Sequence, residues 1–188
     1  MKQEKRVLVI THQLSRTGAP IVLMDVIGVC KQEGYHIDVI TMMDGELRTE
    51  LEKMGISVQV QKNFFEEKES FYCYAKGYDL VWANTLITYE AIHVLNNTEI
   101  PVIWWLHEGR QYFDYFKTVI PDFKKLGKNI HVYSVGHYLQ EVVREIYGVE
   151  TDILHLEVKN QRDVPYEMMQ ISGGACDCKR GCEKVRFF

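Results

Sequence analysis

His107 and Glu108 are the residues of this chain whose types and position most clearly allow chemistry. They end the apolar run Pro101-Val102-Ile103-Trp104-Trp105-Leu106, and Gly109 follows them. An imidazole can exchange a proton near neutral pH, and a carboxylate accepts hydrogen bonds. Because such a run is typical of a buried strand, the pair is predicted to lie at a strand's carboxyl end, where ligands of open α/β sheets bind.

The pair has two interpretations. Either His107 contacts a ligand, or both residues only finish the strand and the loop, with Glu108 in solvent. The double tryptophan before them favours the first interpretation, because it indicates a strand inside a sheet. Arg110 follows closely and is expected to pair with a nearby acid rather than with a phosphate.

A second candidate region is Thr17-Gly18-Ala19-Pro20, between a predicted strand and a predicted helix. Gly18 has no Cβ to obstruct a ligand, and a helix N-terminus attracts anions. Thr17 is suited to cap the helix and Pro20 to its first turn, although Pro20 removes one N–H donor. The loop therefore either binds a phosphate or simply turns the chain into a capped helix.

Asn84 and Thr85 follow a third predicted strand, which contains Leu80-Val81-Trp82. They either donate hydrogen bonds to a ligand hydroxyl or cap the next helix. Arg16, with His12 and Gln13, lies in the first loop on the same sheet edge and either lines a cleft or is solvated. The aromatic residues Tyr112, Phe113, Tyr115 and Phe116 are expected to pack in the core, with stacking on a sugar or lipid as the alternative.

The elements that position these residues alternate between strand and helix. Arg6 to Thr11 is a β-branched run, and a helix follows from Ile21 to Gly34. The same pattern repeats to a strand at 152–158, with predicted helices over 45–54, 89–95 and 137–147. The segment 63–70 is acidic and aromatic and is expected to be an irregular surface excursion. The alternation predicts a Rossmann-like, doubly wound α/β fold with a mostly parallel sheet and helices on both faces.

Composition excludes several classes of protein. The 188 residues are 46% hydrophobic with a formal charge of -4, which disfavours disorder and nucleic-acid binding. No apolar run reaches the ~18 residues of a membrane span, so a cytoplasmic location is expected. Cys30 and Cys73 are predicted core thiols, and Cys176, Cys178 and Cys182 are read as incidental loop residues rather than a metal site, because a fourth ligand is missing.

The chain is predicted to divide near residue 158. Residues 1–158 form the Rossmann-like domain, and 159–188 form a polar linker followed by the start of a second domain that the chain does not complete.

These features together resemble the amino-terminal half of a family 4 glycosyltransferase with the GT-B fold, a retaining enzyme that uses nucleotide sugars. The resemblance rests on Thr17-Gly18-Ala19-Pro20, on Asn84-Thr85, on Trp105-Leu106-His107-Glu108-Gly109, and on the tail with Gly173-Gly174 and Lys179-Arg180-Gly181. The order of these four segments carries the resemblance. The first loop departs from the family pattern, because Thr17 replaces one of two glycines.

The resemblance implies a role for each segment. His107 would be the catalytic residue beside the donor sugar, and Thr17 and Gly18 would approach the donor phosphates. Acceptor contacts would come from Arg16, Asn84, Thr85 and Glu108. The partners implied are a nucleotide-sugar donor and a glycan, lipid or other hydroxyl acceptor, with no metal and no other cofactor. Peripheral membrane contact, and completion by a partner chain or a missing donor-binding domain, stay open. The chain alone is expected to transfer sugar poorly or not at all.

Two other classes of protein are alternatives to a glycosyltransferase. A non-catalytic binding or assembly module would suit a chain without a complete second domain. A nicotinamide-dependent oxidoreductase is disfavoured, because the first turn lacks Gly-x-Gly-x-x-Gly.

Overall fold

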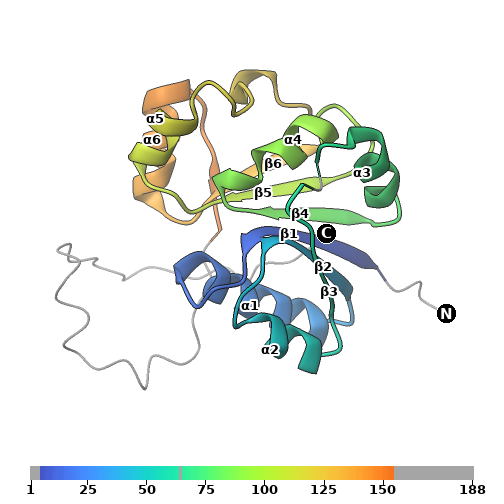
Figure 1. Ribbon diagram of the computed structural model, residues 1–188. Helices are drawn as coiled ribbons and strands as arrows, with labels where there is room; N and C mark the ends of the chain where they lie inside the picture. Colours follow the sequence, from blue (N-terminus) through green and yellow to red (C-terminus); the bar gives the residue numbers. More distant parts are fainter. Residues whose placement is uncertain (1–4, 64, 155–188) are drawn as a thin grey trace, which may run out of the picture. The chain divides into compact units, whose positions relative to one another are not determined.

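The computed structural model describes residues 5–63 and 65–154, and its seven strands form one parallel sheet in the order β3-β2-β1-β4-β5-β6-β7. The predicted α/β, Rossmann-like fold is confirmed (Figure 1). The strands are β1 (Arg6–Gln13), β2 (His36–Met43), β3 (Ser57–Val60), β4 (Leu80–Asn84), β5 (Val102–Leu106), β6 (Ile130–Ser134) and β7 (Asp152–Ile153).

Helices cover both faces of the sheet, as expected of a doubly wound fold (Figure 1). One face carries α1 (Gly18–Gln32) and α2 (Arg48–Lys53). The other carries α3 (Lys68–Ala75), α4 (Tyr89–Leu95), α5 (Arg110–Phe116) and α6 (His137–Tyr147), with two short 3₁₀ turns, η1 (Leu86–Thr88) and η2 (Phe123–Lys125). The chain changes faces between β3 and β4, so the strand order reverses between the adjacent strands β1 and β4.

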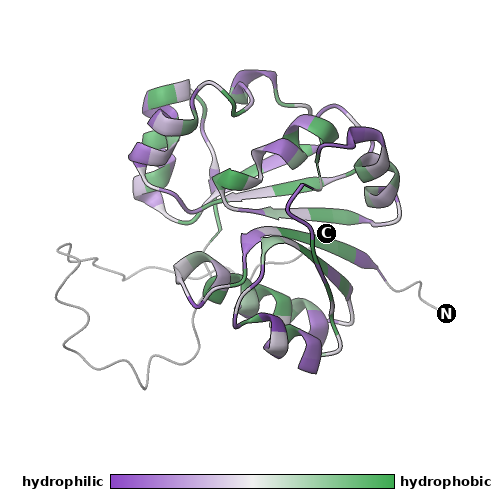
Figure 2. Cartoon of the chain, viewed as in Figure 1, coloured by the Kyte–Doolittle hydropathy of each residue, from purple (hydrophilic) through white to green (hydrophobic). Residues whose placement is uncertain are grey.

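The core forms because successive residues of each strand point to opposite faces. Figure 2 shows the hydrophobic residues concentrated on the central strands. In β5, Trp104 stacks on Phe123 of η2 with ring centroids 5.1 Å apart, on the α3–α6 side. Trp105 points to the opposite face and meets Trp82 of β4 edge-on at 5.7 Å. Both sides of β5 are therefore filled by large aromatic rings.

The register of the strands brings three carboxyl ends together. Thr11 of β1 pairs with Asn84 of β4, and Asn84 pairs with Trp105 of β5. The residues that follow these strands consequently share one edge of the sheet, at the point where the strand order reverses. Ligands of open α/β sheets bind at this kind of position.

The observed helix bounds match the predicted bounds to different degrees. The bounds predicted for Tyr89–Leu95 and His137–Tyr147 are confirmed. Helix α1 begins earlier than predicted, at Gly18, and Pro20 occupies its first turn as expected. Helix α2 is shorter than the predicted 45–54 and covers Arg48–Lys53, because Gly45 packs directly against the main chain of Leu14 instead of starting a helix.

In the following region one prediction is confirmed only in part and another is wrong. The segment 63–70 was expected to be an irregular surface excursion: Asn63 and residues 65–67 do lie in turns and bends, but α3 begins at Lys68 and Phe65 is buried against Phe71. Cys73 was expected in the core and is exposed, because α3 turns Phe71 and Ala75 toward the sheet. The matching prediction for Cys30 is confirmed: the thiol is buried, and burial raises its pKa to about 11.

Several expectations fall outside the described residues. They concern the division at residue 158, the tail cysteines Cys176, Cys178 and Cys182, and the end of the last strand beyond Leu154. In the described parts of the chain, every helix is too short or too polar to cross a bilayer. The same residues contain no cluster of metal-ligating side chains.

Candidate functional site

The predicted site residues all follow three neighbouring strands at the carboxyl edge of the sheet. Arg16, Thr17 and Gly18 come after β1. Asn84 is the last residue of β4, and Thr85 follows it. His107 and Glu108 follow β5, which is the next strand in the sheet. The structure thus brings the three sequence segments to the same edge.

His107 sits on the ring of Trp105, with centroids 4.3 Å apart. Burial and, to a smaller extent, the nearby ring of His12 together lower the pKa of this imidazole to about 4. Its Nε2 atom is buried and has no hydrogen-bond partner. At neutral pH the side chain is therefore an uncharged imidazole whose buried Nε2 atom has no hydrogen-bond partner.

Asn84 is fully buried, and neither its Nδ2 nor its Oδ1 atom has a hydrogen-bond partner. The Nε1 atom of Trp105, its register partner on β5, also lacks one. Each such buried polar group costs about 1–3 kcal/mol when left unsatisfied. Asn84 does not cap the following helix, so its amide is available to a polar ligand.

Glu108 is turned into the protein and is not the solvated carboxylate of the alternative interpretation. Its Oε2 atom accepts hydrogen bonds from the main-chain N–H groups of Leu86 at 2.8 Å and His107 at 3.0 Å. Burial raises the pKa of the Glu108 carboxyl, and these donors oppose the rise. The carboxylate thereby ties the end of β5 to the first residue of η1.

Thr85 is fully buried and has a backbone conformation, φ 81° and ψ 158°, that normally requires glycine. Its N–H donates to Trp105 O at 2.7 Å. Its carbonyl accepts from Trp104 Nε1 at 3.0 Å and from Thr88 Oγ1 at 2.8 Å. These bonds hold a strained residue in place, and strain of this kind concentrates at functional sites.

His12, which the sequence left as either a cleft residue or a solvated one, lies at this site. It lies near the end of β1, and its Nδ1 atom is 3.1 Å from Thr85 Oγ1. Burial lowers the pKa of its imidazole. The feature that places it here is its position one residue after Thr11, at the carboxyl end of the strand that pairs with β4.

The first loop presents main-chain donors at the start of α1. Thr17 occupies the capping position, but its side chain makes no capping bond and instead accepts from Gln13 Nε2. Pro20 has no N–H, and the N–H of Ile21 donates to Thr17 O at 3.1 Å. Gly18 and Ala19 therefore supply the remaining N–H groups of the first turn. Gly18 is exposed, and a Cβ there would meet nothing within 4 Å.

Arg16 is exposed and forms an ion pair with Glu50 of α2. A shallow hollow of ≈ 660 Å³ opens beside it, between the ends of β1 and β2. The lining residues are Ser15, Asp44, Gly45, Glu46, Arg48 and Thr49. This hollow is on the carboxyl side of the sheet and borders the first loop.

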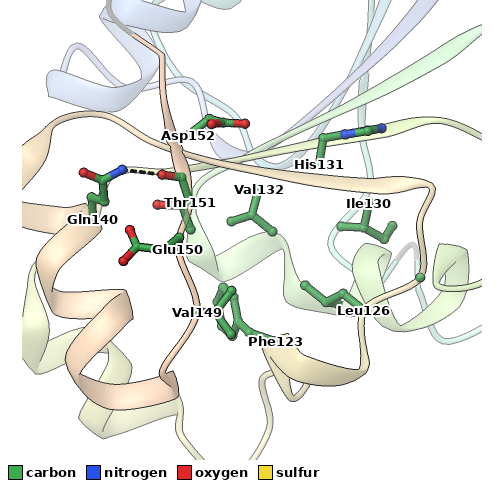
Figure 3. Close-up of a pocket in the computed structure, with 11 residues that line it drawn as sticks. Phe123, Leu126, Ile130, His131, Val132, Gln140, Val149, Glu150, Thr151 and Asp152 are labelled. Carbon is green, nitrogen blue, oxygen red and sulfur yellow. Dashed lines mark hydrogen bonds between the residues drawn. The ribbon is translucent and has the colours of Figure 1, made fainter.

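A second pocket, of ≈ 460 Å³, lies elsewhere and contains none of the predicted site residues. Its lining includes the first half of β6 and the turn before β7. Figure 3 shows the side chain of Gln140 bonded to the main chain of Thr151, with Phe123, Leu126 and Val149 below them. Its position away from the carboxyl ends of β1, β4 and β5 separates it from the candidate site.

Two further expectations concern α5. Arg110 pairs with Glu145 of α6, which confirms that it binds an acid. Of the aromatic residues expected in the core, Phe113 is fully buried, whereas Tyr115 is 79% exposed and Tyr112 is 42% exposed. The core prediction is therefore wrong for both tyrosines, because one face of α5 points to solvent.

Comparisons with known proteins agree with this geometry. A sequence profile described as glycosyl-transferase family 4 matches residues 3–162. A search among curated protein sequences finds no match. Among solved structures, Anabaena HepE in complex with UDP and glucose is similar with a TM-score of 0.64 and 18% identity, over 81% of this chain and 44% of HepE.

Two other solved structures share the fold. A glycosyltransferase from Rickettsia africae has a TM-score of 0.58 and 15% identity, over 81% of this chain and 43% of its own. An alpha-glucosyltransferase in complex with UDP and a 13-mer DNA containing an HMU base has a TM-score of 0.53 and 12% identity. The match covers 82% of this chain and 42% of the alpha-glucosyltransferase chain. The chain thus spans less than half the length of these proteins. With the profile covering most of its residues, the chain belongs to glycosyl-transferase family 4.

Proposed function

We propose that this chain is the amino-terminal, acceptor-side half of a retaining glycosyltransferase that uses a nucleotide sugar. The observation that supports this most is the group of buried polar atoms without partners at the carboxyl edge, on Asn84, Trp105 and His107. A sugar carries several hydroxyl groups, each able to donate and accept hydrogen bonds. Such a ligand can satisfy an amide, an indole N–H and an imidazole together.

His107 is the proposed catalytic residue. Because burial keeps the pKa of its imidazole near 4, the ring is neutral and binds by hydrogen bonding rather than as a cation. It would hold a hydroxyl of the donor sugar and orient the charge that develops near the anomeric carbon and the departing phosphate. The retaining reaction of this family is usually drawn without a protein nucleophile, so no second carboxylate is required.

The donor phosphates are proposed to approach Thr17 and Gly18. The first turn of α1 offers the N–H groups of Gly18 and Ala19 and the positive end of the helix dipole. The structures of HepE and of the alpha-glucosyltransferase contain UDP, which supports a nucleoside diphosphate as the leaving group. The remaining contacts to the nucleotide would come from a donor-binding domain.

The acceptor is proposed to be a glycan, lipid or other hydroxyl compound. Asn84 would contact it through its unpartnered amide, and Arg16 would contact it from the loop after β1. Thr85 and Glu108 were predicted to bind the acceptor too, but their hydrogen bonds are internal, which favours a supporting role for them. We expect the reaction to need no metal, so a chelator should leave the rate unchanged.

The test is a nucleotide-release assay on the chain joined to a donor-binding domain, with UDP-glucose and a panel of hydroxyl acceptors. We expect His107→Asn to lower kcat by about 10²-fold or more, as for loss of a polar group that stabilises developing charge. His131→Asn is the matched control, because His131 is exposed and lines the pocket of Figure 3. Equal turnover in the His107 variant and the parent would contradict the proposal.

The isolated chain provides the second arm of this test. Without the contacts of a donor-binding domain it should release nucleotide slowly or not at all. Rapid turnover by the isolated chain would show that the site is complete within these residues. A stable complex with another polypeptide, with no turnover in any arrangement, would favour the assembly module instead.

A further inference from the structure

A group of aromatic side chains joins α4 to α5 on the outer surface of the domain. The rings of Tyr89 and Phe116 lie 5.8 Å apart, and Tyr115 meets Phe116 edge-on at 4.8 Å. His93 extends the group on α4, with its ring 6.1 Å from that of Tyr89. Tyr112 lies one turn before Tyr115 on the same side of α5. We call these side chains the aromatic patch, and the proposed function uses none of them.

The aromatic patch is anchored on the core and open to solvent. Tyr89 and Phe116 are partly buried and pack against the hydrophobic core, whereas Tyr115 is 79% exposed. The Nε2 atom of His93 lies 2.6 Å from Val119 O, and it must be the donor because a carbonyl oxygen only accepts. This bond ties α4 to the segment after α5. The ring of Tyr115 is therefore presented to solvent on an ordered support.

The aromatic patch continues from the candidate site. Tyr89 begins α4, which follows Thr85 and the short turn η1. Tyr112 lies in the first turn of α5, which follows Glu108. The carboxylate of Glu108 accepts from the N–H of Leu86 at 2.8 Å and so ties the two connecting segments together. Both helices of the patch thus start at the carboxyl edge, from the same segments that carry the site.

The chemistry of the patch suits a carbohydrate. A sugar ring has apolar C–H faces bounded by hydroxyl groups. A tyrosine has an apolar ring with a hydroxyl at its tip, so it can pack against such a face and hydrogen-bond a hydroxyl at the rim. Tyr112 and Tyr115 offer two such rings with exposed fractions of 42% and 79%.

The charge around the patch disfavours an anionic membrane surface. Arg110 of α5 is paired with Glu145. The other acidic and basic side chains within α4 and α5 are Glu90 and Asp114, both acidic, and Lys117 follows α5. Helices that lie on membranes combine an aliphatic face with several lysines or arginines. A neutral glycan needs no such excess of positive charge.

We propose that the aromatic patch is an acceptor subsite that binds a glycan, with Tyr112 and Tyr115 stacking on sugar units beyond the one that reacts. The inference rests on the proposed function, because it makes the acceptor of that reaction an oligosaccharide. Tyr112 and Tyr115 set the affinity for this acceptor and take no part in the chemistry at His107.

The test is an NMR titration of the full chain with maltotetraose and with cellotetraose. We expect at least one of them to bind, with C–H protons of the sugar moving upfield over the tyrosine rings. Tyr115→Phe keeps the ring and should keep the affinity. Tyr115→Leu keeps an apolar side chain without the ring and should weaken binding by about 2- to 10-fold. Tyr138→Leu is the matched control, because Tyr138 is 67% exposed on α6, outside the patch, and this variant should bind as the parent does.

Absence of binding by both tetrasaccharides, or equal affinity in the parent and in Tyr115→Leu, would overturn the proposal. Binding to phosphatidylglycerol vesicles in place of the tetrasaccharides would overturn it in favour of a membrane surface. The proposed function is read separately, because His107→Asn should lose turnover but bind the tetrasaccharide as the parent does. Full turnover by His107→Asn, with tetrasaccharide binding still dependent on Tyr115, would remove the proposed function and leave a glycan-binding surface.

Discussion

Two histidines at the carboxyl edge are kept uncharged by burial, and this neutrality decides what each can do. His107 loses solvation because its ring packs against the ring of Trp105. The Nδ1 atom of His12 lies 3.1 Å from Thr85 Oγ1. A charged imidazole would repel its neighbour and would hold a sugar hydroxyl only as a donor. Two neutral rings can donate and accept, which suits a ligand covered with hydroxyl groups.

The lowered pKa of His107 predicts a pH dependence of folding. In the unfolded chain this imidazole takes up a proton near pH 6.5, whereas in the folded protein it does so near pH 4. The unfolded state therefore binds more protons between these values, and stability falls as the pH decreases from about 6.5 to 4. The free energy of unfolding lost in this window through His107 is at most about 3 kcal/mol.

Urea unfolding at pH 7 and near pH 4.5 measures this effect, with His107→Asn as the comparison. The parent protein should lose more stability on acidification than the variant. The other titrating groups, including Glu108, are present in both proteins and largely cancel. An equal loss of stability in the parent and in the variant would mean that His107 has the same pKa in the folded and unfolded states.

At the scale of elements, the site depends on turns that sequence patterns only partly reveal. The apolar runs before Asn84 and His107 predicted where β4 and β5 end, because a continuous hydrophobic run reports burial on both faces of a sheet. The run that ends at Thr11 placed the end of β1 two residues early, since β1 continues to Gln13. The three runs also placed the polar residues after them on one edge. The bounds of α4 and α6 were equally readable from their apolar spacing.

The remaining features depend on contacts between distant segments. No local pattern indicates that Thr85 takes a positive φ or that Glu108 points back to Leu86, since both follow from packing of β4 against β5. Helix α3 was missed because only Phe71 and Ala75 of this helix are buried, so its sequence has a weak apolar pattern among charged residues. The exposure of Cys73 follows from the same cause.

The turn after β2 packs closely against the end of β1, at Gly45 and Leu14. An added Cβ at Gly45 would lie 2.3 Å from the main-chain carbon and oxygen of Leu14. Gly45→Ala should therefore force the two loops apart and lower the free energy of unfolding by about 1–3 kcal/mol, as overpacking does. Gly18→Ala is the control, because a Cβ at Gly18 has open space around it.

Urea denaturation of the two alanine variants checks this prediction. The Gly18 variant should unfold within ~0.5 kcal/mol of the parent protein, as surface substitutions do. If Gly45→Ala were equally stable, the contact between the turn and Leu14 would not exist in solution.

At the scale of the whole molecule, the described residues form one doubly wound domain whose ligand edge lies at the reversal of strand order. The chain covers 44% of HepE and similar shares of the other two structures. A site on the carboxyl edge of one such domain needs further contacts to enclose a nucleotide sugar. In the proposed function, the ligand would supply partners for the buried polar atoms on Asn84, Trp105 and His107, which have none among the described residues.

The most direct measurement is a titration of the isotope-labelled chain with UDP-glucose, followed by main-chain amide resonances. Binding at the carboxyl edge predicts shifts at Gly18, Ala19 and His107, with Val149 and Glu150 in the pocket of Figure 3 unchanged. Shifts confined to Val149 and Glu150, or no shift at Gly18 and His107 at any concentration, would contradict a sugar-nucleotide site at this edge.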